Sequence, residues 1–336
     1  MLLALTMPNH VSPSRERVLA FATDPAWAGK PFWMLNVLRF KPDGGAEKYA
    51  RYGAMMVAPG GPLDKAGGRV VLGGHARALV GAEEFDQVAI VEYPSPTAFV
   101  AMASSAEYEQ VAQVRGAARA RARAARANIL PRSPQERLAG LESQYLIPMR
   151  AGFYQLEQPA PAVRAGRSVR RFTPATAWAT PSGLVGGAAA GARVGETTST
   201  KAQVEGFMAD RTLGGAATPL WHLNLLKFIA GDGAKRYKSY ARPMGKPGGL
   251  LNQYGARSTL ARACFPSLLG EHDFDSAIIA EYPDRDHFLS MASDPEYLAT
   301  SAHRHAALEQ TCIVSVAPLL PAKLVRQLPR RTRASL

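Results

Sequence analysis

One stretch of this chain occurs twice, and it constrains the fold more than any other feature. Residues 85–108 (FDQVAIVEYPSPTAFVAMASSAEY) match residues 274–297 (FDSAIIAEYPDRDHFLSMASDPEY) at 12 of 24 positions without a gap. Upstream, residues 31–40 (PFWMLNVLRF) and 219–228 (PLWHLNLLKF) are identical at six of ten positions. Self-similarity at a constant offset indicates an internal duplication. We therefore predict two copies of one domain in this chain.

The pattern of apolar residues predicts the same order of elements in both copies. A short amphipathic helix at residues 12–23 or 198–211 comes before an apolar strand at residues 31–40 or 219–228. A helix and a second strand (68–74 in the first copy) follow, and the strand at 87–93 or 276–282 ends at a Tyr-Pro pair. Helix-capping residues then predict a helix broken in two, and last strands are expected near residues 128–131 and 313–319.

This β-α-β-β-α-β order is the ferredoxin-like pattern, which belongs to the α+β class. Its antiparallel sheet carries helices on one face only, so the other face must be buried against something else. A connection of some sixty residues between the copies is long enough for the two sheets to pack face to face within one chain.

Composition shifts give the domain boundaries. We assign residues 12–131 to the first ferredoxin-like repeat and 198–322 to the second. Residues 132–197 are rich in Ala, Gly and Pro and are predicted to be a partly irregular linker. Residues 323–336 form a basic tail.

Charge and cysteine content restrict the function classes. The net charge is +13, with much of the excess at residues 115–126 and in the tail. Binding of a polyanion through this Arg-rich stretch is one hypothesis, but no nucleic-acid motif accompanies it, and we favour a solvated helix face. Two cysteines without paired spacing argue against a disulfide framework or structural zinc site, and they fit a reducing cytoplasm. No apolar run approaches a membrane span.

Several motifs of the chain resemble a bacterial family. They are LNLLKF at 223–228, the EYP strand end at 281–283, S-x-EY at 105–108 and His-Arg-x-Ala-Ala-Leu at 303–308. In these the chain is similar to the domain-of-unknown-function 1330 family of the dimeric α/β-barrel superfamily. The resemblance implies that two ferredoxin-like units form an intrachain barrel, with a further homodimer left open. The superfamily includes cofactor-free monooxygenases, isomerases, cyclases, decarboxylases, haem enzymes and ligand binders, and fold alone does not choose among them.

Candidate site residues are the polar residues that recur at equivalent positions in the two copies. A glutamate on an apolar strand face can act as a general acid or base, or can be ion-paired to Arg115 or Arg304 as a structural tie. Asparagine can donate to a substrate oxyanion or can bond locally, and tyrosine can line a site or fill a core. The recurring pairs are Asn36/Asn224, Tyr52/Tyr240, Glu92/Glu281, Tyr93/Tyr282, Tyr108/Tyr297 and Arg115/Arg304.

Histidines break the symmetry between the copies. The second copy has His222 and His303 where the first has Met34 and Val114. We therefore expect the working site in the second copy. The predicted catalytic residues are Glu281, His303, Arg304, Tyr240 and Asn224, and the predicted substrate-binding residues are Asn36, Tyr52, Glu92, Arg115, His222 and Tyr297.

The leading hypothesis is a cofactor-independent isomerase, lyase or cyclase that uses general acid–base chemistry on a carbonyl-containing, anionic small molecule. In it Glu281 or His303 is the base, and Arg304, Asn224 and Tyr240 hold the oxyanion. The alternatives are a cofactor-free monooxygenase and a non-catalytic ligand-binding or structural module. We expect no cofactor and no metal, since the common nucleotide, serine-hydrolase and zincin motifs are lacking.

Overall fold

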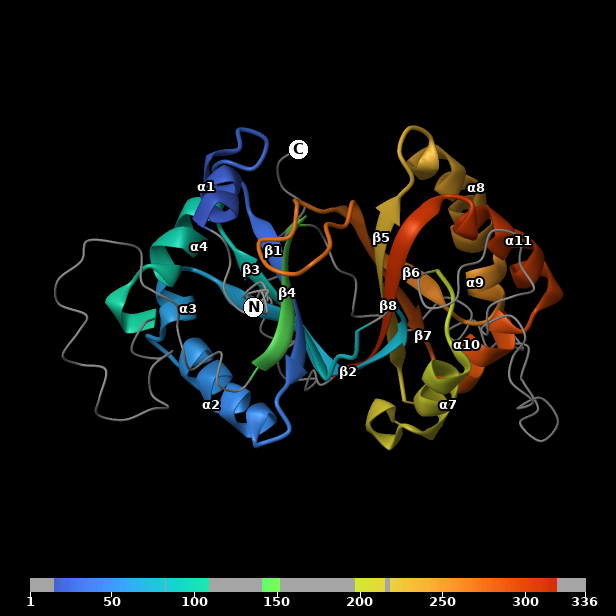
Figure 1. The fold of residues 1–336 in the computed structure, drawn as a ribbon, viewed down its shortest axis with the longest axis horizontal. Helices are drawn as coiled ribbons and strands as arrows, with labels where there is room; N and C mark the ends of the chain where they lie inside the picture. Colours follow the sequence, from blue (N-terminus) through green and yellow to red (C-terminus); the bar gives the residue numbers. More distant parts are fainter. Residues whose placement is uncertain (1–14, 82, 109–140, 152–196, 215–217, 319–336) are drawn as a thin grey trace, which may run out of the picture. The chain divides into compact units, whose positions relative to one another are not determined.

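The computed structural model describes residues 15–81, 83–108, 141–151, 197–214 and 218–318. Its chain divides into two compact units. The first contains most of the first repeat, and the second contains most of the second repeat (Figure 1). None of the helices in these described ranges combines the length and apolar character that a membrane span requires.

The elements of the first repeat follow the predicted order. They are α1 (Arg15–Thr23), β1 (Phe32–Phe40), α2 (Gly45–Val57), α3 (Pro62–Lys65), β2 (Arg69–Val80), β3 (Gln87–Tyr93), α4 (Pro96–Ala103) and β4 (Leu141–Arg150).

The second repeat repeats this order. Its elements are α7 (Lys201–Ala209), the 3₁₀ turn η3 (Arg211–Leu213), β5 (Leu220–Phe228), α8 (Gly233–Gly245), α9 (Leu250–Gln253), β6 (Arg257–Ala263), β7 (Ser276–Tyr282), α10 (Arg285–Ala292), α11 (Pro295–His305) and β8 (Leu308–Pro318).

Strand order within each repeat is that of a ferredoxin-like fold. The strands of the first repeat lie in the order β4-β1-β3-β2, and those of the second in the order β8-β5-β7-β6. The β1–β4, β5–β7, β5–β8 and β6–β7 pairs are antiparallel. The predicted α+β class and the two ferredoxin-like repeats are thus confirmed.

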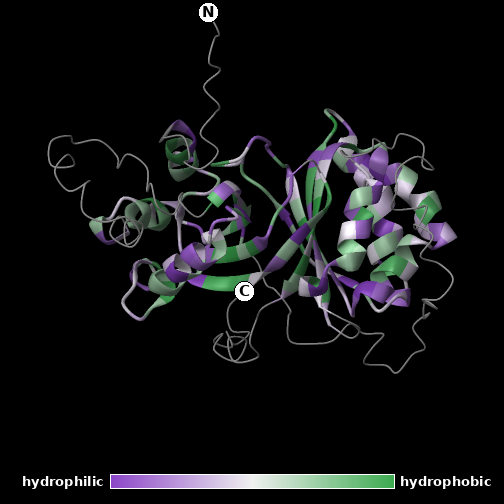
Figure 2. Ribbon diagram, turned by 60° about the horizontal axis from the view of Figure 1, so that its bottom comes forward, coloured by the Kyte–Doolittle hydropathy of each residue, from purple (hydrophilic) through white to green (hydrophobic). Residues whose placement is uncertain are grey.

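The first strand of each repeat is covered on both faces, as its apolar sequence predicts. Burial along β1 and β5 follows one pattern, in which the asparagine is the first residue that is not fully buried. The helices of each unit lie on one side of its strands (Figure 1), and they carry hydrophobic and hydrophilic residues in alternating bands (Figure 2). Each unit accordingly has its own apolar core between helices and sheet.

Side-chain caps fix the helix starts where the sequence predicts them. Thr200 and Gln203 form a capping box at α7, and Ser95 accepts a hydrogen bond from the backbone of α4. Asp284 and Asp294 cap α10 and α11 in the same way. The predicted break between two helices after β7 is therefore present, because the second cap begins a new helix.

The fourth strand of the first repeat lies further along the chain than predicted. β4 is Leu141–Arg150 and pairs with β1 along its whole length. β4 falls inside residues 132–197, so the predicted start of the linker at residue 132 is wrong. Residues 128–131, where the strand was predicted, lie outside the described residues. Pro148 and the polar start of this segment obscured its strand character, although β4 as the last strand in the order can accommodate proline.

The compact units do not coincide with the sequence repeats. Leu72–Gln87 of the first repeat belongs to the second unit, where β2 pairs antiparallel with β8. Cys264–Asp273 of the second repeat belongs to the first unit, where Leu269 and Cys264 form bridges to β4. Each unit is therefore completed by a segment of the other repeat.

The pairing of β2 with β8 depends on the absence of a side chain at Gly74. A Cβ atom there would lie 2.3 Å from the carbonyl oxygen of Ala317 and 2.6 Å from the Val316 side chain. We expect Gly74→Ala to lower the free energy of unfolding by about 1–3 kcal/mol, as overpacking in a close-packed region does. Urea unfolding followed by circular dichroism measures this change.

Gly53→Ala in α2 is the matched control, because no atom lies within 4 Å of a Cβ at that position. It should be neutral or stabilise the helix by up to about 1 kcal/mol. Equal effects of the two substitutions would contradict the close approach described for Gly74.

Candidate functional site

Helix α11 places Arg304 in the interior of the second unit. Ser301, Arg304 and His305 are its buried residues, and their three- and four-residue spacing puts them on one face. His303 lies off this face and is exposed. His303 therefore points away from Arg304, because consecutive residues of a helix point in different directions, and its catalytic role stays a prediction.

The Arg304 guanidinium is surrounded by neutral hydrogen-bond acceptors. The residue is only 4% exposed. Its Nη1 donates to the carbonyl oxygen of Thr197 (2.9 Å) and its Nη2 to Oγ1 of Thr311 (3.2 Å), and its charge acts on the Tyr237 hydroxyl. Among the described residues, no carboxylate forms an ion pair with it. A buried charge is normally paired, so this guanidinium can accept an anion.

Tyrosines of α8 and α11 lie against one another, and the charge of Arg304 acts on two of them, Tyr237 and Tyr240. The rings of Tyr237 and Tyr240 lie 5.4 Å apart between centroids, and those of Tyr240 and Tyr297 lie 6.5 Å apart. Burial raises the pKa of Tyr237 to about 12. Burial, and then the neighbouring hydroxyls of Tyr297 and Tyr237, hold the pKa of Tyr240 well above its usual range. These hydroxyls therefore stay protonated and can donate hydrogen bonds to an oxyanion.

Asn224 lies on the sheet face that the helices cover. It alternates with Leu226 on β5, and its partner on β7 is Ile278, which packs against the cluster that contains Leu226 and Tyr237. Its Nδ2 donates to the carbonyl oxygen of His222 at 3.0 Å. Asn224 thus shares a face with Arg304 and Tyr240, but this bond supports the local structural role that the sequence left open.

Glu281 points to the opposite face of the sheet. Its neighbour Tyr282 packs in the core beneath the helices, and successive strand residues alternate between faces. Its Oε2 accepts from Nε (2.7 Å) and Nη2 (2.6 Å) of Arg257, the residue directly opposite on β6, and the two side chains are 16% and 15% exposed. Glu281 therefore lies on the other face of the sheet from Arg304, and its ion-pair partner is Arg257 rather than the predicted Arg304.

His222 is a core residue between strand and helices. It is 2% exposed, its ring centroid is 4.0 Å from that of Phe288, and its Nε2 is 3.3 Å from Oγ of Ser315. Burial lowers the pKa of His222 to about 3. The imidazole is therefore neutral at physiological pH and a weak base.

The equivalent residues of the first repeat bond to one another. The Tyr52 hydroxyl donates to that of Tyr108 at 3.3 Å. Asn36 donates to the carbonyl oxygens of Met34 and Ala89. Glu92 accepts from Nε1 of Trp33 (2.8 Å) and from Arg69 (3.0 Å), and Arg115 lies outside the described residues.

The sequence missed three partners of the site. Thr311 is fully buried and holds Arg304 from β8, while its own hydroxyl donates to the carbonyl oxygen of Leu225 (2.8 Å). Thr197 contributes a backbone carbonyl, which no side-chain pattern reveals. Tyr237 has an equivalent in the first repeat, Tyr49, and this recurrence could have identified it as a site residue.

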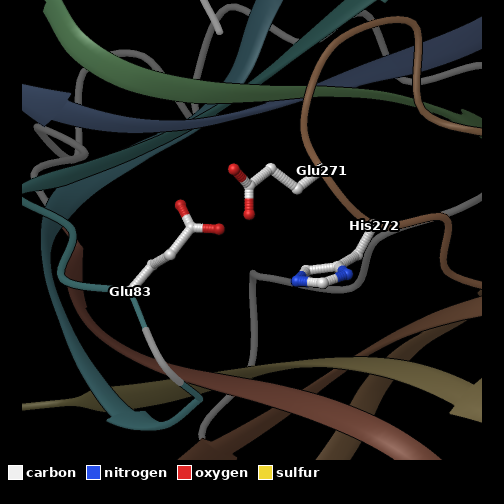
Figure 3. A group of neighbouring side chains, drawn as sticks. All are labelled: Glu83, Glu271 and His272. Atoms are coloured by element: carbon white, nitrogen blue, oxygen red, sulfur yellow. The ribbon is translucent and has the colours of Figure 1, made fainter. Parts of the chain in front are cut away.

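Figure 3 shows the side chains of Glu83, Glu271 and His272, which are of metal-ligating types. Glu83 belongs to the second unit, whereas Glu271 and His272 belong to the first. Glu271 is exposed, and exposed acidic groups commonly occur without a metal. These residues are therefore not a site of either unit.

Comparison with known proteins gives the family. The family described as "Domain of unknown function (DUF1330)" matches residues 32–126 and 229–317, one segment in each repeat and together more than half of the chain. The chain belongs to the DUF1330 family. Among curated proteins, none matches this DUF1330 chain.

Solved structures similar to this DUF1330 chain include a protein of unknown function from Rhodopseudomonas palustris, which is 28% identical. That match covers 38% of this chain and 100% of the other, with a TM-score of 0.33. An anthrone oxidase-like protein is 8% identical over 87% of this chain and 92% of its own, with a TM-score of 0.45. A chlorite dismutase variant from Candidatus Nitrospira defluvii is 10% identical over 90% and 95%, with a TM-score of 0.36. Likenesses at these TM-scores carry no argument about activity.

The low pKa of His222 predicts a loss of stability in acid. The pKa of His222 is about 3 in the folded chain, whereas an unperturbed histidine, as in the unfolded chain, has a pKa of 6.5. Between these two values the unfolded state binds a proton that the native state does not bind. The contribution of neutral His222 to the free energy of unfolding is therefore fully present above pH 6.5. It decreases as the pH falls toward 3, by about 3 kcal/mol at pH 4. His222→Met, which introduces the residue found at the equivalent Met34, should remove this dependence. Urea unfolding of both proteins at pH 7, 5.5 and 4 measures it.

His303→Met, which replaces an exposed histidine, serves as the control and should not reproduce the pH-dependent difference. A difference in stability between wild type and His222→Met that stays constant from pH 7 to pH 4 would contradict the neutral, buried imidazole.

Proposed function

We propose that the second unit binds a small, anionic, carbonyl-containing molecule at Arg304 and catalyses its enolisation, in which a proton leaves the carbon next to the carbonyl. The reaction class is that of a cofactor-independent isomerase, lyase or cyclase. The observation that carries this proposal is an arginine residue, 4% exposed, whose guanidinium has only neutral hydrogen-bond partners among the described residues.

The charge at Arg304 suits an oxyanion that develops during the reaction. Enolisation of a carbonyl compound places negative charge on oxygen, and a preorganised donor in a dry site stabilises that charge more than water does. Thr197 and Thr311 hold the guanidinium in place before a ligand arrives. Little reorganisation is therefore needed when the charge forms.

The tyrosine hydroxyls are the hydrogen-bond donors of this proposal. Arg304 is the cation that favours the ionised form of Tyr237, Tyr240 and Tyr282, and no carboxylate among the described residues adds to their charge environment. Burial outweighs the cation, so the pKa of each is raised. A protonated Tyr240 near a fixed positive charge can donate a hydrogen bond to an enolate oxygen and stabilise its charge.

This arrangement changes the roles predicted from sequence. Arg304, Tyr240 and Tyr297 remain together as the proposed oxyanion site, with Tyr237 added. Glu281 on the other sheet face and the exposed His303 have no role in it. The site is thus one of charge stabilisation and hydrogen-bond donation. A base from the solvent, water or hydroxide, takes the proton from the carbon next to the carbonyl, and the solvent returns a proton to that carbon when the enolate collapses.

Arg304→Met tests the proposal, because it removes the charge and retains a long side chain. NMR measures the rate at which small oxo acids exchange hydrogen for deuterium at the carbon next to the carbonyl. We expect this rate to fall about 100- to 1,000-fold, the loss typical of removing an oxyanion donor. Tyr240→Phe should lower the exchange rate in the same direction.

His303→Ala and Glu281→Gln are the matched controls in the second repeat, and both should retain the wild-type rate. Exchange that is unchanged in Arg304→Met, or abolished only in Glu281→Gln, would contradict the proposed site. Native mass spectrometry of freshly purified protein identifies a co-purified ligand to use as the substrate.

A further inference from the structure

The geometry points to one class of ligand for this site, and the inference rests on the proposed function. We infer that the ligand is a small monocarboxylate with a flat aromatic or conjugated body. Its carboxylate binds the Arg304 guanidinium, and its body lies against Tyr240 and Tyr297.

Charge balance selects a monoanion. In the described part of the chain, Arg304 is the cation that acts on Tyr237 and Tyr240, and burial raises the pKa of both hydroxyls so that they stay neutral. A carboxylate brings one negative charge and leaves the buried site neutral. A phosphate monoester brings nearly two, and the excess charge would be buried without a partner.

The hydrogen bonds of Arg304 favour a carboxylate in shape as well. The carbonyl oxygen of Thr197 takes one N–H of Nη1, and Thr311 takes one of Nη2. A guanidinium has more N–H donors than its described partners use. Two parallel N–H groups match the two oxygens of a carboxylate, which makes such pairs strong and directional.

Thr311 acts as a positioning residue in this arrangement. Its hydroxyl is bound from both sides, since it donates to the Leu225 carbonyl and accepts from Arg304. The hydroxyl therefore fixes Nη2 against β8 without contacting the ligand. Thr311→Val removes the acceptor and keeps the shape of the side chain.

The surroundings of the cation are aromatic and apolar. Tyr240 packs against both apolar clusters of the second unit, one around Leu226 and Tyr237 and the other around Tyr282 and Phe288. Its ring and that of Tyr297 meet at 71°, an edge-on arrangement. Aromatic rings pair favourably at such distances, so a flat conjugated body gains more here than an aliphatic one.

Isothermal titration calorimetry of the full chain with four probes tests this inference. The probes are benzoate, its neutral isostere benzamide, the dianion phenyl phosphate and the aliphatic monoanion acetate. We expect benzoate to bind at least about 30-fold more tightly than benzamide, the value of a charge-assisted pair, and more tightly than phenyl phosphate or acetate. In Arg304→Met the preference for benzoate over benzamide should be lost.

Thr311→Val is a second variant, which tests the inference even if Arg304→Met does not fold. It should lower the affinity for benzoate several-fold and leave the affinity for benzamide unchanged. Arg257→Met, on the opposite sheet face, is the control and should retain the preference. Tighter binding of phenyl phosphate, equal binding of acetate and benzoate, or no benzoate binding would each overturn the monocarboxylate class. The hydrogen-exchange measurement with oxo acids is independent of these probes, so failure of this inference is distinguishable from failure of the proposed function.

Discussion

The antiparallel pairing of β5 with β7 and β8 determines where every candidate side chain of the second unit points. Leu226 lies opposite Thr311 and His222 opposite Ser315, so these residues share the face beneath the helices. Trp221, Glu281 and Arg257 occupy consecutive strands on the other face. A shift of one residue in this register would exchange the two sets, because side chains alternate along a strand.

Much of the fold could be predicted because it is encoded in local patterns that occur twice. The Tyr-Pro strand ends, the Ser and Asp caps and the apolar first strands each have a local physical cause, and their recurrence separated signal from coincidence. The position of β4 could not be predicted this way. Its partner β1 lies far away in the sequence, and Leu141–Arg150 contains a proline that obscures its strand pattern.

The candidate site was predicted less completely, for physical reasons. Recurrence identified Arg304, Tyr240 and Tyr297, because equivalent residues occupy equivalent places. It could not assign faces: Glu281 lies beside Tyr282 in sequence and on the opposite side of the sheet in space. His303 and Arg304 diverge for a similar reason, since a helix turns by roughly 100° between neighbours.

The exchange of Leu72–Gln87 and Cys264–Asp273 between the repeats has a consequence for how the gene can be divided. A fragment cut within the connecting segment would leave β8 with β5 but without β2, its second partner strand, and would leave β4 without its bridging loop. Neither half would then encode an autonomous module.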